Sequence, residues 1–136
     1  IQDRSIYEGV YVFAANNYAL GNMSERDFDT YMGLFQSMMM VSKQPDLMVY
    51  LRASVPHLVA NIQKRGRSYE QQISLEYLEG LNARYEAFIN EHYKGKLLII
   101  EVDTIDFLHN PQDFSRIIDR IDAQLYGFFS KSNTEI

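Results

Sequence analysis

Two arginines separated by one glycine, Arg65-Gly66-Arg67, form the most distinctive polar cluster in the sequence. Both guanidinium groups stay charged and offer planar sets of N–H donors, so together they can hold one anionic group such as a phosphate. Glu70 follows and adds a carboxylate to the cluster. The same residues also suit a basic helix end capped by Gly66, because cations favour the negative end of a helix. Both interpretations stay open from these residues alone.

A second polar cluster, Asp3-Arg4-Ser5, lies at the start of the sequence. Arg4 could clamp an anion while Asp3 assists a metal ion or a water molecule. The alternative is a structural ion pair between Asp3 and Arg4, with Ser5 as a helix cap. Taken with Arg65, Arg67 and Glu70, the cluster favours phosphate chemistry, because phosphoryl transfer depends mainly on positioning and charge stabilisation.

Other common kinds of catalytic site find little support. His57, His92 and His109 stand far apart in the sequence, without the spacing of a metal site. No serine nucleophile elbow occurs. The chain has no cysteine, which rules out a disulfide framework or a cysteine metal site and fits a cytoplasmic protein.

Composition narrows the class of partner. A chain of 136 residues with 46% hydrophobic residues can bury the core of one domain. Its net charge of −5 argues against binding to nucleic acids or membrane surfaces, because both need a positive field. No apolar run approaches the roughly 18 residues of a membrane span. A local basic cluster in an acidic chain suits a small anionic ligand.

Hydrophobic periodicity predicts the elements that position these clusters. Short apolar runs predict two buried strands, at 47–51 and 97–102. Repeats of three and four predict five helices, several of them preceded by a serine or asparagine that can cap the first turn. The predicted helices lie at 5–20, at 24–42 after Ser24, at 56–66 after Ser54, from Ser74 towards Gly95, and from Asn110-Pro111 onward.

Strands alternating with long helices predict an α/β fold with a parallel sheet covered on both faces. Ile1-Gln2 looks like the end of a further strand, and the sequence looks like part of a larger protein. Ligands bind outside the carboxyl ends of such strands. We therefore expect three segments to share one rim of the sheet: 3–5, 52–54 and 103–107.

Two further segments carry no candidate chemistry. The run Met38-Met39-Met40 is most simply flexible core filler, with a subunit interface as the alternative. Residues 130–136 read as a polar tail.

Five segments, in this order, resemble the deoxynucleoside kinase family, and most of all its bacterial deoxyadenosine/deoxyguanosine kinase branch. Each motif is weak alone, but the ordered set is fairly specific and covers essentially the whole chain. The segments are Asp3-Arg4-Ser5-Ile6-Tyr7-Glu8, Tyr11-Val12-Phe13-Ala14, Tyr50-Leu51-Arg52-Ala53, Lys64-Arg65-Gly66-Arg67-Ser68-Tyr69-Glu70 and Leu75-Glu76-Tyr77-Leu78-Glu79.

The resemblance implies a P-loop kinase-like fold, a three-layer parallel sheet covered by helices. Residues 1–136 would be the C-terminal part of a single kinase domain, with a lid at about 62–73. The implied reaction moves the γ-phosphate of ATP, with Mg²⁺, onto the 5′-hydroxyl of a deoxynucleoside, a purine one by branch, in nucleotide salvage. A homodimer or a related heterodimer is expected.

On the acceptor side, the resemblance places Arg4 beside the 5′-hydroxyl and the transferring phosphate, with Asp3 near Mg²⁺. Phe13 matches the aromatic residue that stacks on the substrate base. Glu70 matches the carboxylate that hydrogen-bonds the sugar 3′-hydroxyl. The plainer alternatives are that Phe13 is ordinary core and that Tyr69 and Glu70 form a solvated loop.

On the donor side, the resemblance makes Arg65 and Arg67 the lid arginines that hold the phosphates of ATP. Asp106 and Phe107 match the loop that lies along the donor's adenine. The plainer alternative for Asp106 is that it caps a turn.

The sequence departs from the family pattern in two ways. No G-x-x-x-x-G-K-[ST] phosphate loop occurs in these residues, and the family carries that loop upstream of the Asp-Arg-Ser segment. We therefore expect about 80 further residues on the N-terminal side, and no catalysis by this chain alone. Gly9 stands where the family usually has an aspartate that helps to recognise the base, so the base preference stays open; Glu8 could stand in.

Two alternative functions stay open. A thymidylate-kinase-like nucleoside monophosphate kinase shares the fold and an arginine lid, but it needs a site for the acceptor's own phosphate, and Glu70 argues against one. A non-catalytic nucleotide-binding or assembly module would use the many Met and Tyr residues of the helices.

Overall fold

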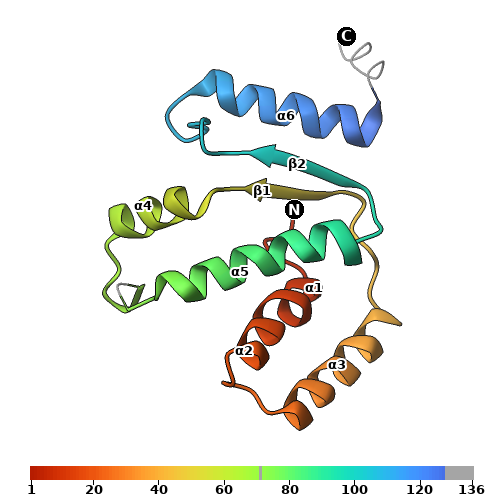
Figure 1. Ribbon diagram of the computed structural model, residues 1–136. Helices are drawn as coiled ribbons and strands as arrows, with labels where there is room; N and C mark the ends of the chain where they lie inside the picture. The colour runs from red at the N-terminus through yellow and green to blue at the C-terminus, as the bar shows by residue number, and fades with distance from the viewer. Residues whose placement is uncertain (71, 128–136) are drawn as a thin grey trace. The chain divides into compact units, whose positions relative to one another are not determined.

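The computed structural model describes residues 1–70 and 72–127, which divide into two compact units (Figure 1). The first unit holds residues 1–43 and 59–94, and the second holds 44–58 and the chain from 95 onward. The predicted polar tail at 130–136 lies outside the described residues.

The first unit is helical. Its first helical segment is continuous and consists of α1 (Ile6–Glu8), the π-helical η1 (Gly9–Ala14) and α2 (Ala15–Ala19). The longer helices are α3 (Glu25–Met39), most of α4 (Val55–Arg65) and α5 (Leu75–Ala87). The 3₁₀ turn η2 (Ser68–Glu70) follows α4, and the π-helical η3 (Phe88–His92) continues α5.

The segment from α1 to α2 confirms the helix predicted at 5–20, and it packs against both α3 and α5. Ser5 caps it, since the Ser5 hydroxyl accepts a hydrogen bond from the Tyr7 N–H and the Glu8 carboxylate accepts one from the Ser5 N–H. The wide π turn rotates side chains away from a 3.6-residue repeat, so that Val10, Val12 and Ala14 are all buried.

An aromatic cluster forms the core of the first unit. Tyr7 and Tyr11 each stack on Phe88 at 5.8 and 5.7 Å between ring centroids, and each meets Phe35 of α3 edge-on. Tyr93 also meets Tyr7 and Phe88 edge-on. Burial raises the pKa of both Tyr7 and Tyr93. Each such pair contributes about 0.5–1.5 kcal/mol beyond the area it buries, so the cluster locks three helices together.

Two glycines inside helices make a matched test of this packing. A Cβ at Gly80 of α5 would lie 2.6 Å from Oδ1 of the buried Asn16, whereas a Cβ at Gly33 of α3 meets nothing within 4 Å. We expect Gly80→Ala to lower the free energy of unfolding by about 1 kcal/mol or more through overpacking. Gly33→Ala should raise it by about 0.5–1 kcal/mol through helix propensity. Urea unfolding of both variants measures this, and equal shifts would contradict the close approach.

The second unit is built on a parallel pair of strands, β1 (Met48–Arg52) and β2 (Leu97–Glu101), in register from Met48 opposite Leu97 to Arg52 opposite Glu101. Helix α6 (Pro111–Tyr126) packs against β2. The buried residues Leu98, Ile100 and Val102 form a core against which Ile117 and Ile121 of α6 pack. Both predicted strands and the predicted parallel α/β architecture are confirmed.

Helix starts follow the predicted caps. The side chains of Ser24, Ser54 and Ser74 each accept a hydrogen bond from the backbone N–H three residues later, at 3.2, 3.3 and 3.1 Å. Asn110 accepts one from the Gln112 N–H at 3.0 Å. These bonds satisfy N–H groups that the first turn of a helix leaves without partners, which is why the predicted helix starts hold. The predicted end at 42 is too late, since α3 ends at Met39.

The strand predicted at Ile1-Gln2 is wrong, since residues 1–5 are irregular and bend at Asp3 and Arg4. Arg4 has φ of 63°, in the left-handed region, and this conformation cannot continue an extended strand.

Several apolar residues that periodicity predicts to be inside are exposed. Met38 and Met40 are 39% and 81% exposed, so the interpretation of the methionine run as core filler is wrong for these two. On α6, Phe114, Ile118 and Leu125 are also exposed, while Ile117 and Ile121 are packed as predicted. Among the described residues, the strands cover only one narrow stripe of α6. The apolar side chains on either side of that stripe are therefore exposed.

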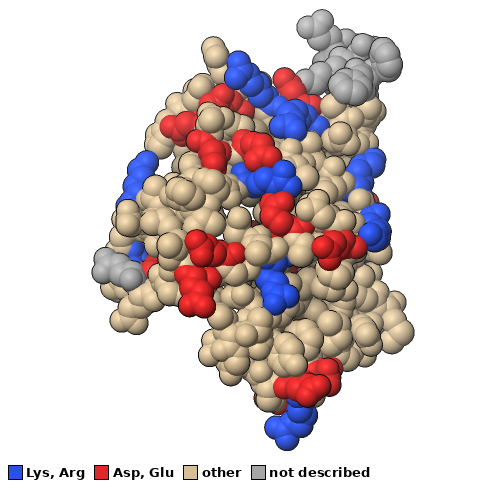
Figure 2. Space-filling model, in the orientation of Figure 1, with Lys and Arg blue, Asp and Glu red and all other residues tan. Residues whose placement is uncertain are grey.

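Figure 2 shows Asp and Glu interspersed with Lys and Arg on the face in view. Within residues 1–70 and 72–127, no helix has the length and apolar character needed to cross a membrane.

Candidate functional site

Arg4 is held in a strained conformation over an aromatic ring. Its φ of 63° is uncommon for any residue other than glycine and costs on the order of 1–3 kcal/mol. The guanidinium carbon lies 5.3 Å from the centre of the Phe13 ring, within cation–π range. Arg4 and Phe13, two predicted site residues from different sequence motifs, therefore lie side by side.

Phe13 is half-buried and meets the Tyr85 ring edge-on, at 6.4 Å and 86°. Phe13 therefore contacts both a cation and a second aromatic ring, and its role against a substrate base stays a prediction. Burial raises the pKa of Tyr85, and the nearby Glu8 and Asp3 carboxylates raise it further against the opposing effect of Arg4. The Tyr85 hydroxyl therefore stays protonated at neutral pH and can donate a hydrogen bond.

Tyr85 is a candidate that sequence reasoning missed as a site residue. It falls in the inner stripe of its helix, where a tyrosine reads as packing. Only its position beside Arg4 and Phe13 distinguishes it, and that position depends on the contact between α5 and η1.

Asp3 is exposed and supplies one carboxylate beside Arg4. Among residues 1–70 and 72–127, no group of three or more His, Cys, Asp or Glu side chains is arranged to hold a metal ion. Mg²⁺ is commonly held by one or two carboxylates together with substrate phosphates and water. Asp3 could therefore be one ligand of an ion that substrate phosphates and water also hold, and it does not form a complete metal site by itself.

Arg65 is the last residue of α4, and Gly66 and Arg67 follow it. Gly66 has φ of +66° and its N–H donates to the Ile62 carbonyl at 3.1 Å, which closes the helix. The interpretation of Gly66 as a helix cap is confirmed. The turn that it allows sends the chain back through η2 towards Glu70.

Arg65 and Arg67 converge on one anionic group, the carboxylate of Glu70. Arg65 Nε lies 2.9 Å from Glu70 Oε2, and an Arg67 terminal nitrogen lies 3.6 Å from Glu70 Oε1. Glu70 is buried, at 8% exposure, so the interpretation of Glu70 as part of a solvated loop is wrong. A buried carboxylate needs such partners because desolvation penalises an unpaired charge. The two arginines thus share one carboxylate in this structure, and their binding of a phosphate stays a prediction.

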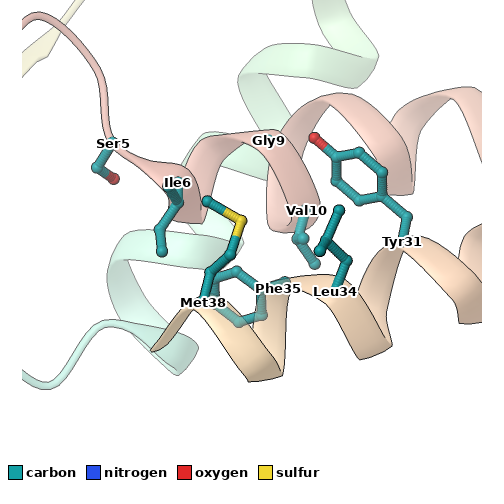
Figure 3. A pocket seen from close by; sticks show the side chains of 8 residues that line it. All are labelled: Ser5, Ile6, Gly9, Val10, Tyr31, Leu34, Phe35 and Met38. Atoms are coloured by element: carbon teal, nitrogen blue, oxygen red, sulfur yellow. The ribbon is translucent and has the colours of Figure 1, made fainter. Parts of the chain in front are cut away.

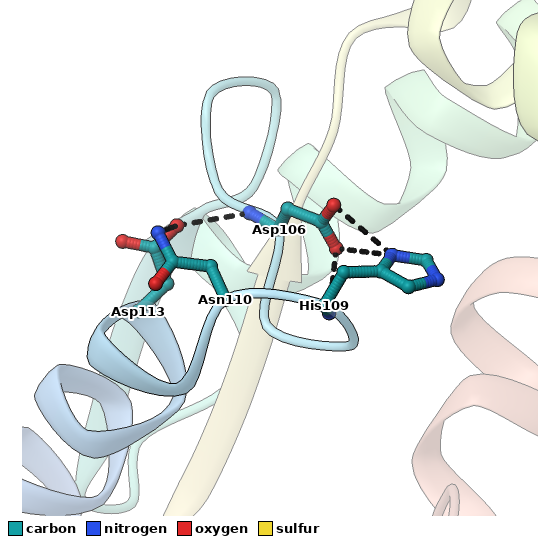
Figure 4. Close-up of polar contacts among 4 residues, drawn as sticks. All are labelled: Asp106, His109, Asn110 and Asp113. Atoms are coloured by element: carbon teal, nitrogen blue, oxygen red, sulfur yellow. Dashed lines mark hydrogen bonds and ion pairs between the residues drawn. The ribbon is translucent and has the colours of Figure 1, made fainter.

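In the second unit, Asp106 and His109 are joined by hydrogen bonds in the loop between β2 and α6 (Figure 4). His109 Nδ1 lies 2.9 Å from Asp106 Oδ1, and the His109 N–H also donates to it. The Asp106 N–H in turn donates to Asp113 Oδ2, which accepts from Asn110 as well. Asp106 does cap a turn, and this network fixes the loop that carries the exposed Phe107.

The Asp106–His109 pair is expected to make a pH-dependent contribution to stability. Hydrogen bonds from the His109 side chain and backbone lower the pKa of Asp106. A lowered folded-state pKa means that this contribution to stability is present above the unfolded pKa of about 3.9 and is lost as pH falls through the folded value. We expect NMR titration to place Asp106 below that reference and His109→Ala to bring it back up. An Asp106 pKa that is the same in both proteins would contradict the pair.

The carboxyl ends of the two strands meet as expected. The Ser54 N–H donates to Asp103 Oδ1 at 2.9 Å and lowers the pKa of Asp103, and Arg52 pairs with Glu101 at 3.0 Å. Segments 52–54 and 103–107 therefore share one rim of the second unit. Segment 3–5 belongs to the first unit.

Gly9 lies against α3, in a groove lined by Ser5, Ile6, Val10 and neighbouring residues (Figure 3). A Cβ at Gly9 would lie 2.9 Å from the Tyr31 hydroxyl. An aspartate at this position would therefore require Tyr31 to move. The closeness of Tyr31 to Gly9 could not be predicted from the sequence.

The family of this chain is established by comparison with known proteins. The deoxynucleoside kinase family model matches residues 1–126, and the chain belongs to that family. The deoxyadenosine/deoxycytidine kinase of Bacillus subtilis is 33% identical over 128 residues, covering 93% of this chain and 59% of the relative. The deoxyguanosine kinase of Lactobacillus johnsonii is 33% identical over 134 residues, covering 92% of this chain and 59% of the relative.

Solved structures agree on the fold. A deoxyadenosine kinase from M. mycoides with bound dATP has a TM-score of 0.71 and 29% identity, covering 88% of this chain and 60% of that one. The same enzyme with bound dCTP also has a TM-score of 0.71, at 25% identity. The P-loop kinase-like α/β fold is thereby confirmed. The chain spans about three fifths of the length of these relatives.

Proposed function

We propose that the protein transfers the γ-phosphate of ATP to the 5′-hydroxyl of a deoxynucleoside, preferably a purine deoxynucleoside, in nucleotide salvage in the cytoplasm. The observation that carries this proposal is the convergence of Arg65 and Arg67 on one anion position. Two guanidinium groups aimed at one point suit the oxygens of a transferring phosphoryl group, whose charge grows in the transition state. Family membership supplies the class of reaction.

On the acceptor side, Arg4 binds the 5′-hydroxyl and the transferring phosphate, and Phe13 stacks on the base. The strain at Arg4 supports this role, because strained backbone persists where the surroundings hold a functional side chain in place. Tyr85 forms the edge of the base pocket through its contact with Phe13. Glu70 binds the sugar 3′-hydroxyl.

On the donor side, Arg65 and Arg67 hold the phosphates of ATP, and the loop at Asp106 and Phe107 lies along the adenine. The hydrogen bonds that fix this loop support a positioning role. Mg²⁺, when bound, would neutralise the phosphates, with Asp3 as the contributing carboxylate. Arginines around a phosphate reduce the charge repulsion that opposes approach of the acceptor.

We further propose that residues 1–136 are the C-terminal part of one kinase domain whose phosphate loop lies upstream, with a lid at about 62–73. Such a protein acts as a homodimer or a related heterodimer. Exposed apolar side chains support contacts with further protein surface, since Met40, directly after α3, is 81% exposed and Phe114 of α6 is 52% exposed.

A panel of acceptors tests the proposal on the full-length protein. We expect the four deoxynucleosides to be phosphorylated with ATP and Mg²⁺, and purine deoxynucleosides to raise the melting temperature most. Deoxynucleoside monophosphates serve as the comparison, because a thymidylate-kinase-like enzyme would prefer them. Preferential use of monophosphates, or no transfer to any acceptor, would overturn the proposal.

A further inference from the structure

Glu70 occupies one nitrogen of each of the two arginines, and a phosphate would use donors of the same kind. Its two carboxylate oxygens lie 2.9 Å from Arg65 Nε and 3.6 Å from an Arg67 nitrogen. Carboxylate and phosphate oxygens both seek such planar donors, and they cannot occupy one position together. In this structure Glu70 therefore stands where an anionic ligand of the arginine pair would bind.

The burial of Glu70 makes this contact consequential. Its side chain is only 9% exposed, compared with 49% for Arg65 and 52% for Arg67. Loss of both partners would leave a desolvated carboxylate without compensation, which costs more than breaking an ordinary surface ion pair. A phosphate that took both arginines would leave Glu70 buried without its observed partners, unless another hydrogen-bond donor reached it.

The proposed function, on which this inference rests, supplies such a donor in the sugar hydroxyl of the acceptor. We propose that Glu70 is a gate between the two substrates: it holds the lid arginines until a deoxynucleoside hydroxyl donates to it, and the arginines then become available to the phosphates of ATP. Binding of the acceptor therefore strengthens binding of the donor. Because coupling between sites is reciprocal, ATP must strengthen binding of the deoxynucleoside by the same factor.

The local backbone permits the exchange. Gly66, in its left-handed conformation, separates the two arginines and can change conformation at little steric cost. Glu70 is the last residue of the 3₁₀ turn η2. Its N–H donates a hydrogen bond to the Arg67 carbonyl at 3.0 Å. One short turn between two longer helices can rearrange without disturbing either.

The first test uses the unmodified full-length protein and a non-hydrolysable ATP analogue with Mg²⁺. Calorimetry should show that the analogue binds about 10-fold more tightly when a saturating deoxynucleoside is present. Equal affinity with and without the deoxynucleoside would overturn the gate, and this measurement requires no variant to fold.

The second test is Glu70→Gln, which keeps the shape of the side chain and removes its charge. Two effects of opposite sign are expected: the analogue alone binds about 10-fold more tightly, and the KM for the deoxynucleoside rises. Glu76→Gln, at an exposed glutamate in the first turn of α5, is the matched control and should change neither. If Glu70→Gln weakens deoxynucleoside use without tightening the analogue, Glu70 is only a sugar ligand and the gate is wrong. Absence of phosphoryl transfer in the unmodified protein would instead contradict the proposed function.

Discussion

Arg67→Ala in the full-length protein is expected to lower kcat by about 10²-fold or more while the protein stays folded. The guanidinium of Arg67 lies beside an anion position that Arg65 also reaches, and in the proposed reaction both groups turn to the transferring phosphate, whose developing charge they stabilise. Loss of one of two such groups removes stabilisation that the ground state does not need, so the effect falls on turnover more than on binding.

Steady-state kinetics at saturating deoxynucleoside and ATP measure this effect, with circular dichroism and thermal unfolding as checks of the fold. Arg26→Ala is the matched control, because Arg26 lies on α3 with its side chain 89% exposed and pairs only weakly with Asp27 at 3.5 Å. Its turnover should equal that of the unmodified protein. A kcat for Arg67→Ala within twofold of the control would remove Arg67 from the phosphate site.

Arg4→Gly is expected to lower kcat/KM by about 10²–10³-fold with little loss of stability. The guanidinium is the group we place at the 5′-hydroxyl, whereas the backbone at this position has a left-handed φ of 63° that glycine adopts freely. Relief of that strain, worth about 1 kcal/mol, offsets the cation–π contact with Phe13, which contributes about 0.5–1 kcal/mol.

Two companion variants separate function from strain at this position. Arg4→Ala also removes the guanidinium but keeps the strain, so it should be as inactive as Arg4→Gly and about 1 kcal/mol less stable. Arg4→Lys keeps a charge without the planar fork and should retain intermediate activity. An Arg4→Gly protein that keeps its activity but unfolds more easily would show that Arg4 is structural.

Much of the fold could be predicted because it depends on local signals. Serine caps at Ser24, Ser54 and Ser74 fix helix starts through bonds to residues three positions away. The two strands stand out as continuous apolar runs, which is the pattern that favours strands of a parallel sheet. Among the described residues, β2 buries Leu98 and Ile100 and leaves its other residues partly or fully exposed. Such features need no knowledge of the partner segment.

The misses arise where the conformation depends on segments distant in sequence. The positive φ of Arg4 and its contact with Phe13 follow from how the chain enters the first helix, which no spacing rule encodes. Tyr85 gains its place from the contact of α5 with η1. The π turn at Gly9–Ala14 shifts side chains out of a 3.6-residue repeat, so periodicity misassigns faces there.

The candidate site divides in the same way. The pairing of Arg65 and Arg67 on one anion was predictable, because two rigid forks flank a glycine that can turn the chain. That the anion is Glu70 was not predictable, since the sequence equally allowed a solvated loop. His109 was likewise missed, because an isolated histidine in a loop has no distinctive spacing until its bond to Asp106 is seen.

The most direct test of the central claim is the transfer of label from γ-³²P-ATP by the full-length protein. With Mg²⁺ and a purine deoxynucleoside, the label should appear in the deoxynucleoside 5′-monophosphate. It should be absent when a 5′-deoxy analogue replaces the acceptor. Label that appears only as free phosphate, or that reaches only acceptors already carrying a phosphate, would contradict the assignment of this protein as a deoxynucleoside 5′-kinase.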